Sequence, residues 1–114
     1  MHTLIIGQRG TGKTALLARL RRYFPQSVCL CLDEEIEKLH GPIIDIFKNK
    51  GEAHFRKFEV ETFTQLLSRF TEKVRPVFIA LGAGFEGALP KNWEVVYLRR
   101  DVKVEDFIFP ERPN

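Results

Sequence analysis

Short apolar runs alternate with longer amphipathic stretches along this chain, and that alternation predicts strands and helices in turn. The apolar runs are nearly unbroken, which is typical of strands in a parallel sheet that is covered on both faces. The pattern therefore predicts an α/β domain of three layers, with helices on both sides of a central parallel sheet of about four strands. The strands are expected at 3–6, 28–32, 77–81 and 95–98.

Helical spacing fills the stretches between these runs. Leu16, Leu17 and Leu20 recur at three- and four-residue steps, and Pro25 ends the helix that they predict. Asp33 is placed to cap the next helix, because a carboxylate at that position can accept the free N–H groups of the first turn. Helices are expected over 13–24, 34–40, 43–50 and 52–73.

The composition indicates a single globular domain. The chain has 114 residues, and its 44% hydrophobic and 29% charged residues exclude a disordered chain or a disulfide scaffold. We expect one domain over residues 1–100 and a short irregular segment over 101–114. Cys29 and Cys31 lie too close on one predicted strand to bridge across the fold, and they match no four-ligand metal spacing, so both are expected to be free thiols.

The charges suit an anionic ligand. Lys and Arg number 18 against 15 Asp and Glu, which leaves a formal net charge of +3. The basic residues are spread along the chain rather than gathered in one patch, which argues against nucleic acid as a partner. No apolar run approaches the roughly 20 residues of a membrane span, and no secretory signal opens the chain, so we expect a cytoplasmic protein without membrane binding.

A glycine-rich loop between the first strand and the first helix carries the clearest chemistry. Gly7-Gln8-Arg9-Gly10-Thr11-Gly12-Lys13-Thr14 matches the P-loop pattern G-x-x-x-x-G-K-[ST], which points N–H groups and the positive end of a helix at phosphate oxygens. Lys13 is expected to reach the β- and γ-phosphates of ATP, and the hydroxyl of Thr14 to bind Mg²⁺. The alternative is a glycine turn whose lysine only lies on the surface. The expected nucleotide-binding residues are Gly7, Gly10, Thr11, Gly12, Lys13 and Thr14.

A P-loop does not name a reaction, so the residues after the other strands have to be considered. Ligands of parallel sheets lie beyond the carboxyl ends of the strands. Asp33 follows the second predicted strand, and Gly82-Ala83-Gly84 follows the third, so Asp33 is a functional carboxylate or only a helix cap. Arg56 lies between them on the longest helix, and it either binds an anion or pairs on the surface with Glu52 or Glu59 at helical spacing.

These elements resemble the shikimate kinase family. The most family-specific of them is Gly51-Glu52-x-x-Phe55-Arg56-x-x-Glu59, and the P-loop, Asp33, Ile44-x-Ile46-Phe47 and the triplet at 82–84 support it. The resemblance spans residues 3–98 and implies the strand order 2-3-1-4. The implied activity is phosphoryl transfer from ATP to shikimate, which yields shikimate 3-phosphate.

The resemblance also implies a role for each site residue. Lys13 and Asp33 are the implied catalytic residues, with Asp33 holding the substrate hydroxyls and helping to orient or deprotonate the one that is attacked. Arg56 is implied to pair with the substrate carboxylate, supported by Glu59. Gly82, Ala83 and Gly84 are implied to let the substrate approach closely.

Three features depart from the family pattern. Cys31 stands where the family carries an aspartate that serves the magnesium ion, and a thiol is a poor ligand for this hard cation. Ala83 replaces the middle glycine of the triplet, which is expected to narrow the acceptor pocket. The chain ends at Asn114, soon after the fourth predicted strand, so we expect the family's C-terminal lid and last strand to be missing and the transfer to be slow or absent.

The leading hypothesis is ATP-dependent phosphoryl transfer to a small hydroxylated carboxylic acid. The alternative is a catalytically impaired nucleotide-binding module, either regulatory or part of a larger fusion protein, and a third option is a P-loop hydrolase. The presence of Lys13, Thr14, Asp33 and Arg56 favours the kinase, whereas Cys31 and the lid that is expected to be missing favour the module. The outer edge of the fourth strand is a candidate for pairing with another chain.

Overall fold

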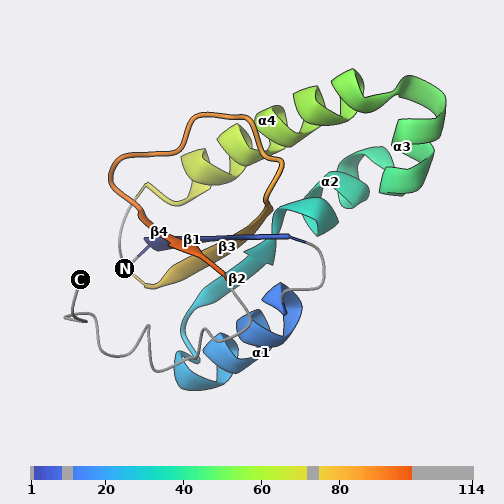
Figure 1. The fold of residues 1–114 in the computed structure, drawn as a ribbon. Helices are drawn as coiled ribbons and strands as arrows, with labels where there is room; N and C mark the ends of the chain where they lie inside the picture. Colours follow the sequence, from blue (N-terminus) through green and yellow to red (C-terminus); the bar gives the residue numbers. More distant parts are fainter. Residues whose placement is uncertain (1, 9–11, 72–74, 99–114) are drawn as a thin grey trace.

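Four parallel strands form the sheet in the computed structural model of the chain, which describes residues 2–8, 12–71 and 75–98 (Figure 1). Their order across the sheet is β2-β3-β1-β4, which confirms the order expected from the sequence. Because all three pairings are parallel, the carboxyl ends of all strands reach the same edge of the sheet. The strands are β1 (His2–Gly7), β2 (Val28–Cys31), β3 (Val77–Gly82) and β4 (Glu94–Tyr97).

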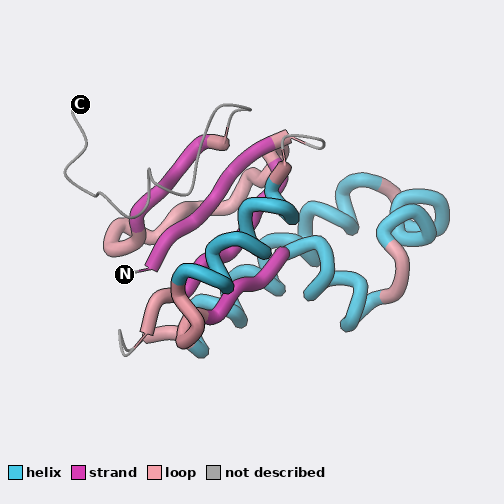
Figure 2. Tube along the Cα trace, turned by 90° about the horizontal axis from the view of Figure 1, so that it is seen from below, coloured by secondary structure: helices cyan, strands magenta, loops and turns pink. Residues whose placement is uncertain are grey.

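Helices cover both faces of this sheet. α1 lies on one face, and α4 lies on the other with α2 and α3 continuing beyond the sheet (Figure 1). Figure 2, which views the molecule from below, shows α1 in front of the strands. The three-layer α/β fold expected from the sequence is therefore present. The helices are α1 (Lys13–Tyr23), α2 (Leu32–His40), α3 (Ile43–Lys50) and α4 (Glu52–Arg69).

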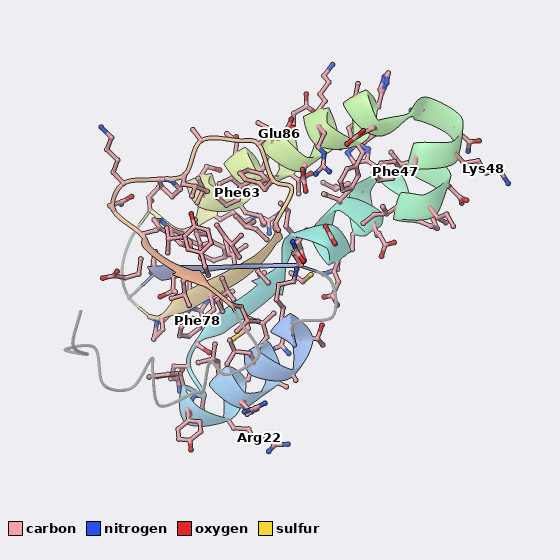
Figure 3. All side chains as sticks on the ribbon, in the orientation of Figure 1. Arg22, Phe47, Lys48, Phe63, Phe78 and Glu86 are labelled. Atoms are coloured by element: carbon pink, nitrogen blue, oxygen red, sulfur yellow. The ribbon has the colours of Figure 1, made fainter. Side chains whose placement is uncertain are left out.

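The strands hold the layers together through side chains that alternate between the two faces. In β1, Leu4 and Ile6 belong to the core cluster under α2, α3 and α4, whereas Ile5 between them packs on the α1 side. This period of two is a property of extended backbone, and β3 repeats it. Figure 3 shows the result for two large rings, with Phe63 of α4 and Phe78 of β3 on opposite sides of the sheet.

Two helix boundaries differ from the sequence-based expectation by more than one residue. Asp33 is not the N-cap of α2: the helix begins at Leu32, Cys31 occupies the cap position, and Asp33 lies in the first turn. Leu32 is fully buried, and packing of its side chain favours a helix that begins directly after the strand. The carboxylate of Asp33, in the first turn, interacts favourably with the positive end of the helix. The longest helix ends at Arg69 rather than at residue 73, because Phe70 leaves the helical conformation and its N–H bonds to the carbonyl of Leu67 at 3.2 Å.

The register of the strands brings the predicted site residues to one edge. Gly7 of β1 pairs with Gly82 of β3. Cys31 of β2 pairs with Ala80, which precedes Gly82 by two residues in the same strand. The end of β1, where the P-loop begins, the start of α2 and the residues just after β3 therefore lie at the same edge of the sheet. Gly10 and Thr11 of the predicted nucleotide site, and the predicted irregular segment at 101–114, lie outside the described residues.

Candidate functional site

Lys13 lies at the start of α1 and points back to the ends of two strands. Its ammonium group donates hydrogen bonds to the carbonyl of Gly7, at the end of β1, and to the carbonyl of Leu81 in β3, the latter at 3.5 Å. Both carbonyls belong to the neighbouring strands that the register aligns. Lys13 is thus held at the carboxyl edge of the sheet, where a ligand of this fold would lie.

Gly12 makes the turn from the loop into α1. Its φ of 90° lies in the left-handed region, and a Cβ there would meet no atom within 4 Å among the described residues, so backbone conformation rather than space requires glycine. The first turn of α1 carries no acidic side chain, and no side chain caps it among the residues that the structure describes. The free N–H groups and the positive end of α1 are therefore available to an anion.

A cavity of about 670 Å³ opens beside this helix end. The small side chains of Ala15 and Ala18 leave room along α1, and the exposed hydroxyl of Thr14 faces the same space. The cavity reaches the end of β2 and the start of α2 on its other side. It is lined by Gly12, Lys13, Thr14, Ala15, Ala18, Cys31 and Asp33.

A second cavity, of about 550 Å³, lies between α2 and α3. Asp33 lines it as well, so this carboxylate is common to the two cavities. Glu37 lines it from the next turn of α2, and its carboxylate accepts the N–H of Ile43 at 3.0 Å, which ties the start of α3 to α2. The remaining lining is apolar and comes from Ile43, Ile44 and Phe47.

Sequence reasoning singled out only Asp33 in the second cavity. Ile44 and Phe47 entered through the family resemblance alone, and their pattern gives no chemical signal. In the structure both are exposed, Ile44 to 75% and Phe47 to 40%, and both line this cavity, so they form part of one exposed apolar surface.

Arg56 forms both of the ion pairs that helical spacing allowed. Its Nη1 lies 3.0 Å from Oε1 of Glu59, and its Nη2 lies 3.6 Å from Oε2 of Glu52. The guanidinium group also lies over the ring of Phe55, 5.3 Å from the ring centre. Arg56 lines neither of the two cavities, but Phe55 packs at 4.8 Å against Phe47, which does line the second one. Phe55 therefore connects Arg56 to the wall of that cavity.

Burial and neighbouring charges shift the pKa values of both partners in the ion pair between Arg56 and Glu59. Glu59 is only 2% exposed, and this burial raises its pKa although Arg56 acts in the opposite direction. The charges of Asp33 and Glu86 raise the pKa of Glu59 further, so both carboxylates lie within electrostatic reach of the pair. Burial lowers the pKa of Arg56, but the hydrogen bond from Arg56 to Glu59 and the charges of Glu59, Glu52 and Glu86 together outweigh it and raise the pKa overall, so Arg56 stays cationic.

Glu86 carried no signal in the sequence, because it lies in an irregular stretch between strands. Figure 3 shows it on the loop that passes α4 after β3. The ring of Phe85, its neighbour, packs edge-on against Phe63 of α4 at 4.9 Å and holds this loop on the helix. The loop thereby brings a third carboxylate, besides Glu52 and Glu59, towards Arg56.

Cys31 contributes a neutral thiol to the first cavity. Burial raises the pKa of Cys31, and the backbone amides of Glu34 and Asp33 oppose this effect without cancelling it. The oxygen donors of Thr14 and Asp33 in the same cavity suit a hard cation such as Mg²⁺, whereas the Cys31 thiol does not. No cluster of three His, Cys, Asp or Glu side chains that could hold a metal ion occurs within the described ranges.

The chain matches a family model described as shikimate kinase over residues 9–105. It is 36% identical over 98 residues to the shikimate kinase of Synechococcus sp. (strain JA-3-3Ab), covering 82% of this chain and 46% of the relative. It is 40% identical over 101 residues to the shikimate kinase of Dictyoglomus turgidum, covering 82% of this chain and 56% of the relative. The chain therefore spans about half the length of these curated relatives.

Solved structures agree with the sequence matches. The crystal structure of shikimate kinase from Aquifex aeolicus vf5 aligns with a TM-score of 0.65 and 30% identity, covering all (100%) of this chain and 66% of that one. Shikimate kinase from Acinetobacter baumannii in complex with shikimate aligns with a TM-score of 0.70 and 30% identity, covering 85% of this chain and 55% of that one. In the described part of the chain, no helix is both long and apolar enough to span a membrane.

Proposed function

The chain belongs to the shikimate kinase family, and we propose that it transfers the γ-phosphoryl group of ATP to a hydroxyl group of a small hydroxylated carboxylic acid, with shikimate as the named candidate. The observation that carries this proposal is the position of Asp33, which lines both cavities. A carboxylate at that junction can hold an acceptor hydroxyl on one side while a phosphoryl group lies on the other. A cytoplasmic location, where ATP is available, is part of the proposal.

The nucleotide belongs in the cavity beside α1. Its phosphates would accept hydrogen bonds from the free N–H groups at the start of the helix and from Lys13, whose ammonium group would exchange carbonyl partners for phosphate oxygens. Thr14 would hold the Mg²⁺ of the nucleotide through its hydroxyl oxygen, and that ion neutralises charge on the phosphates when bound. Phosphoryl transfer needs positioning and charge neutralisation more than covalent help, so these groups are sufficient for the donor side.

The acceptor belongs in the cavity between α2 and α3. The acceptor oxygen forms a bond to the γ-phosphorus, the bond from that phosphorus to ADP breaks, and Asp33 accepts the hydroxyl proton as the new bond forms. Arg56 would pair with the substrate carboxylate. Its Nη2 is the better candidate for that contact, because the 3.6 Å pair with the exposed Glu52 is looser than the 3.0 Å pair of Nη1 with Glu59.

A nucleotide-binding module without kinase activity is the second candidate. Two observations favour it: Cys31 supplies a neutral thiol beside Thr14, and Arg56 is already paired with two carboxylates of its own helix. The module would bind nucleotide through the same P-loop and bind no acceptor. The two functions therefore differ in one measurable property, which is acceptor binding.

Calorimetric titration of shikimate with and without Mg-ADP, followed by a coupled kinase assay, tests the proposal. Arg56→Ala should weaken shikimate binding by about ten- to a hundredfold, because charge-assisted hydrogen bonds contribute roughly 1.5–3 kcal/mol, and should leave Mg-ADP affinity unchanged. Arg69→Ala, which removes an exposed arginine at the far end of the same helix, is the matched control and should change neither. A wild-type protein that binds Mg-ADP but shows neither shikimate binding nor turnover would leave only the module.

A further inference from the structure

The backbone of Gly84 lies directly against the guanidinium group of Arg56. A Cβ atom on Gly84 would come within 2.9 Å of Nη2, 3.2 Å of Nη1 and 3.3 Å of Cζ of that side chain. The first of these distances is shorter than non-bonded contacts tolerate. The backbone of Gly84 does not itself demand glycine, because positive φ angles among the described glycines occur only at Gly12, Gly41 and Gly51. A side chain at position 84 would therefore have to displace the guanidinium group of Arg56.

We propose that Gly84 is a positioning residue of the acceptor site, and that its missing side chain determines where the guanidinium group of Arg56 lies. The consequence for acceptor binding rests on the function proposed above. Gly84 acts through Arg56 and not by touching the reacting atoms. This role differs from the one that the resemblance implied for the triplet, which was to give the substrate itself room.

The other contacts of Arg56 show why the position of the guanidinium group depends on Gly84. Phe55 lies under its plane at 5.3 Å, Glu59 holds Nη1 at 3.0 Å, and Glu52 approaches Nη2 at 3.6 Å. The Nε atom is buried and has no hydrogen-bond partner among the described residues, so only the two terminal nitrogens are tethered. A methyl group at position 84 would push against both of these nitrogens at once.

The clash would move Arg56 and not the sheet. The atoms that a Cβ on Gly84 would meet are the end of a long side chain, which can rotate away at a small cost in folding energy. The ion pair with Glu59 requires a particular orientation of the planar guanidinium group, so that movement would loosen the pair and misplace the donors offered to a carboxylate. Gly84→Ala should therefore impair acceptor binding more than stability.

Gly82 supplies a matched control. A Cβ on Gly82 would meet no atom within 4 Å among the described residues, and its φ is not in the left-handed region. Gly82→Ala makes the same chemical change in the same triplet without touching Arg56. An effect common to both variants would belong to the loop, and an effect of Gly84→Ala alone would belong to the contact with Arg56.

The experiment compares Gly84→Ala and Gly82→Ala in the wild-type and Arg56→Lys backgrounds. Titrations measure the affinities for shikimate and Mg-ADP. In the variants that retain Arg56, the ¹⁵N NMR signal of its Nε–H is a second readout. Gly84→Ala should shift that signal and weaken shikimate binding by about five- to fiftyfold, with Mg-ADP affinity unchanged. Gly82→Ala should leave the Arg56 signal unchanged, because a Cβ on Gly82 meets no described atom within 4 Å. In the Arg56→Lys background, Gly84→Ala should change shikimate affinity by less than about twofold, because lysine lacks the planar group that clashes.

Three results would overturn the proposal. The first is a Gly84→Ala variant whose Arg56 signal matches that of Gly82→Ala, and the second is an equal loss of shikimate affinity in both backgrounds. The third is failure of Gly84→Ala to fold both alone and with Arg56→Lys, whereas rescue of folding by Arg56→Lys would support the clash. A wild-type protein that binds no shikimate would refute the proposed function, but the NMR comparison would still decide the position of Arg56.

Discussion

At the scale of single residues, Cys31 is the side chain whose chemistry fits its surroundings least. It lines a cavity that also holds the ammonium group of Lys13, the hydroxyl of Thr14 and the carboxylate of Asp33. Burial raises its pKa, so the thiol brings no charge at neutral pH to a place where a metal-bound nucleotide is proposed to lie. Magnesium would then depend on Thr14, phosphate and water.

Cys31→Asp should strengthen the magnesium dependence of ADP binding. A carboxylate at this position would add an anionic oxygen beside the cation, an effect of about 1 kcal/mol or about fivefold in affinity for a partly exposed pair. Calorimetric titrations of ADP with and without Mg²⁺ measure the change directly. Because residue 31 is also the N-cap of α2, where aspartate is a preferred residue, thermal unfolding without nucleotide should be recorded alongside.

Cys31→Ser separates charge from polarity in this measurement. Serine offers an oxygen but no charge, so it should leave the magnesium dependence close to that of the wild type. A folded Cys31→Asp variant with unchanged or weaker magnesium dependence would show that residue 31 does not serve the cation.

At the scale of elements, one glycine, Gly51, joins α3, which lines the second cavity, to α4, which carries Arg56. The N–H of Gly51 donates to the carbonyls of Ile46 and Phe47 at 3.1 Å and closes α3, while its own carbonyl accepts the N–H of Phe55 at 3.2 Å and opens α4. Its φ of 89° and ψ of 171° define a backbone conformation that residues other than glycine rarely adopt. The direction in which α4 leaves α3, and with it the position of Arg56 relative to Phe47, depends on this residue.

Gly51→Ala should lower the free energy of unfolding by about 1–3 kcal/mol, because alanine would have to adopt that strained conformation or distort the junction. Urea unfolding followed by the fluorescence of Trp93, the one tryptophan in the chain, reports the loss. Gly82→Ala is the control, since its backbone does not require glycine. Equal stabilities of the two variants would mean that the junction relaxes at no cost.

At the scale of the whole molecule, the proposed site draws on both faces of the sheet. α1 lies on one face and carries Lys13 and Thr14, while α4 lies on the other and carries Arg56 (Figure 1). Both helices reach the same edge because the carboxyl ends of β1, β2 and β3 lie side by side in a parallel sheet: Lys13 donates a hydrogen bond to the carbonyl of Leu81 in β3, and Arg56 contacts Gly84 just after β3. Ligand binding at that edge should therefore stabilise the fold as a unit.

Mg-ADP at a hundredfold excess over its Kd should raise the free energy of unfolding by about 2.7 kcal/mol, because a ligand that binds only the folded chain shifts the folding equilibrium by mass action. Thermal unfolding with and without the nucleotide measures this shift. Lys13→Ala should abolish most of it, whereas Lys48→Ala on the exposed face of α3 should retain it. Stabilisation that survives Lys13→Ala would place the nucleotide away from the P-loop.

The sequence by itself determined the order and type of the elements, the parallel sheet and the family. Strand and helix periodicity is a local property, and a P-loop needs only eight consecutive residues between a strand and a helix, so these features could be predicted without a structure. The family resemblance supplied the strand order, which the structure confirms.

Only the tertiary structure decided how the side chains of distant segments meet. α2 begins at the buried Leu32, so Cys31 and not Asp33 is its N-cap. The local capping preference of Asp33 could not predict this, because the helix start depends on packing. The sharing of Asp33 between two cavities and the contact of Gly84 with Arg56 depend on how α2, α4 and the loop after β3 pack on one sheet. Close packing sets such contacts between residues far apart in the chain, and no periodicity of either segment contains them.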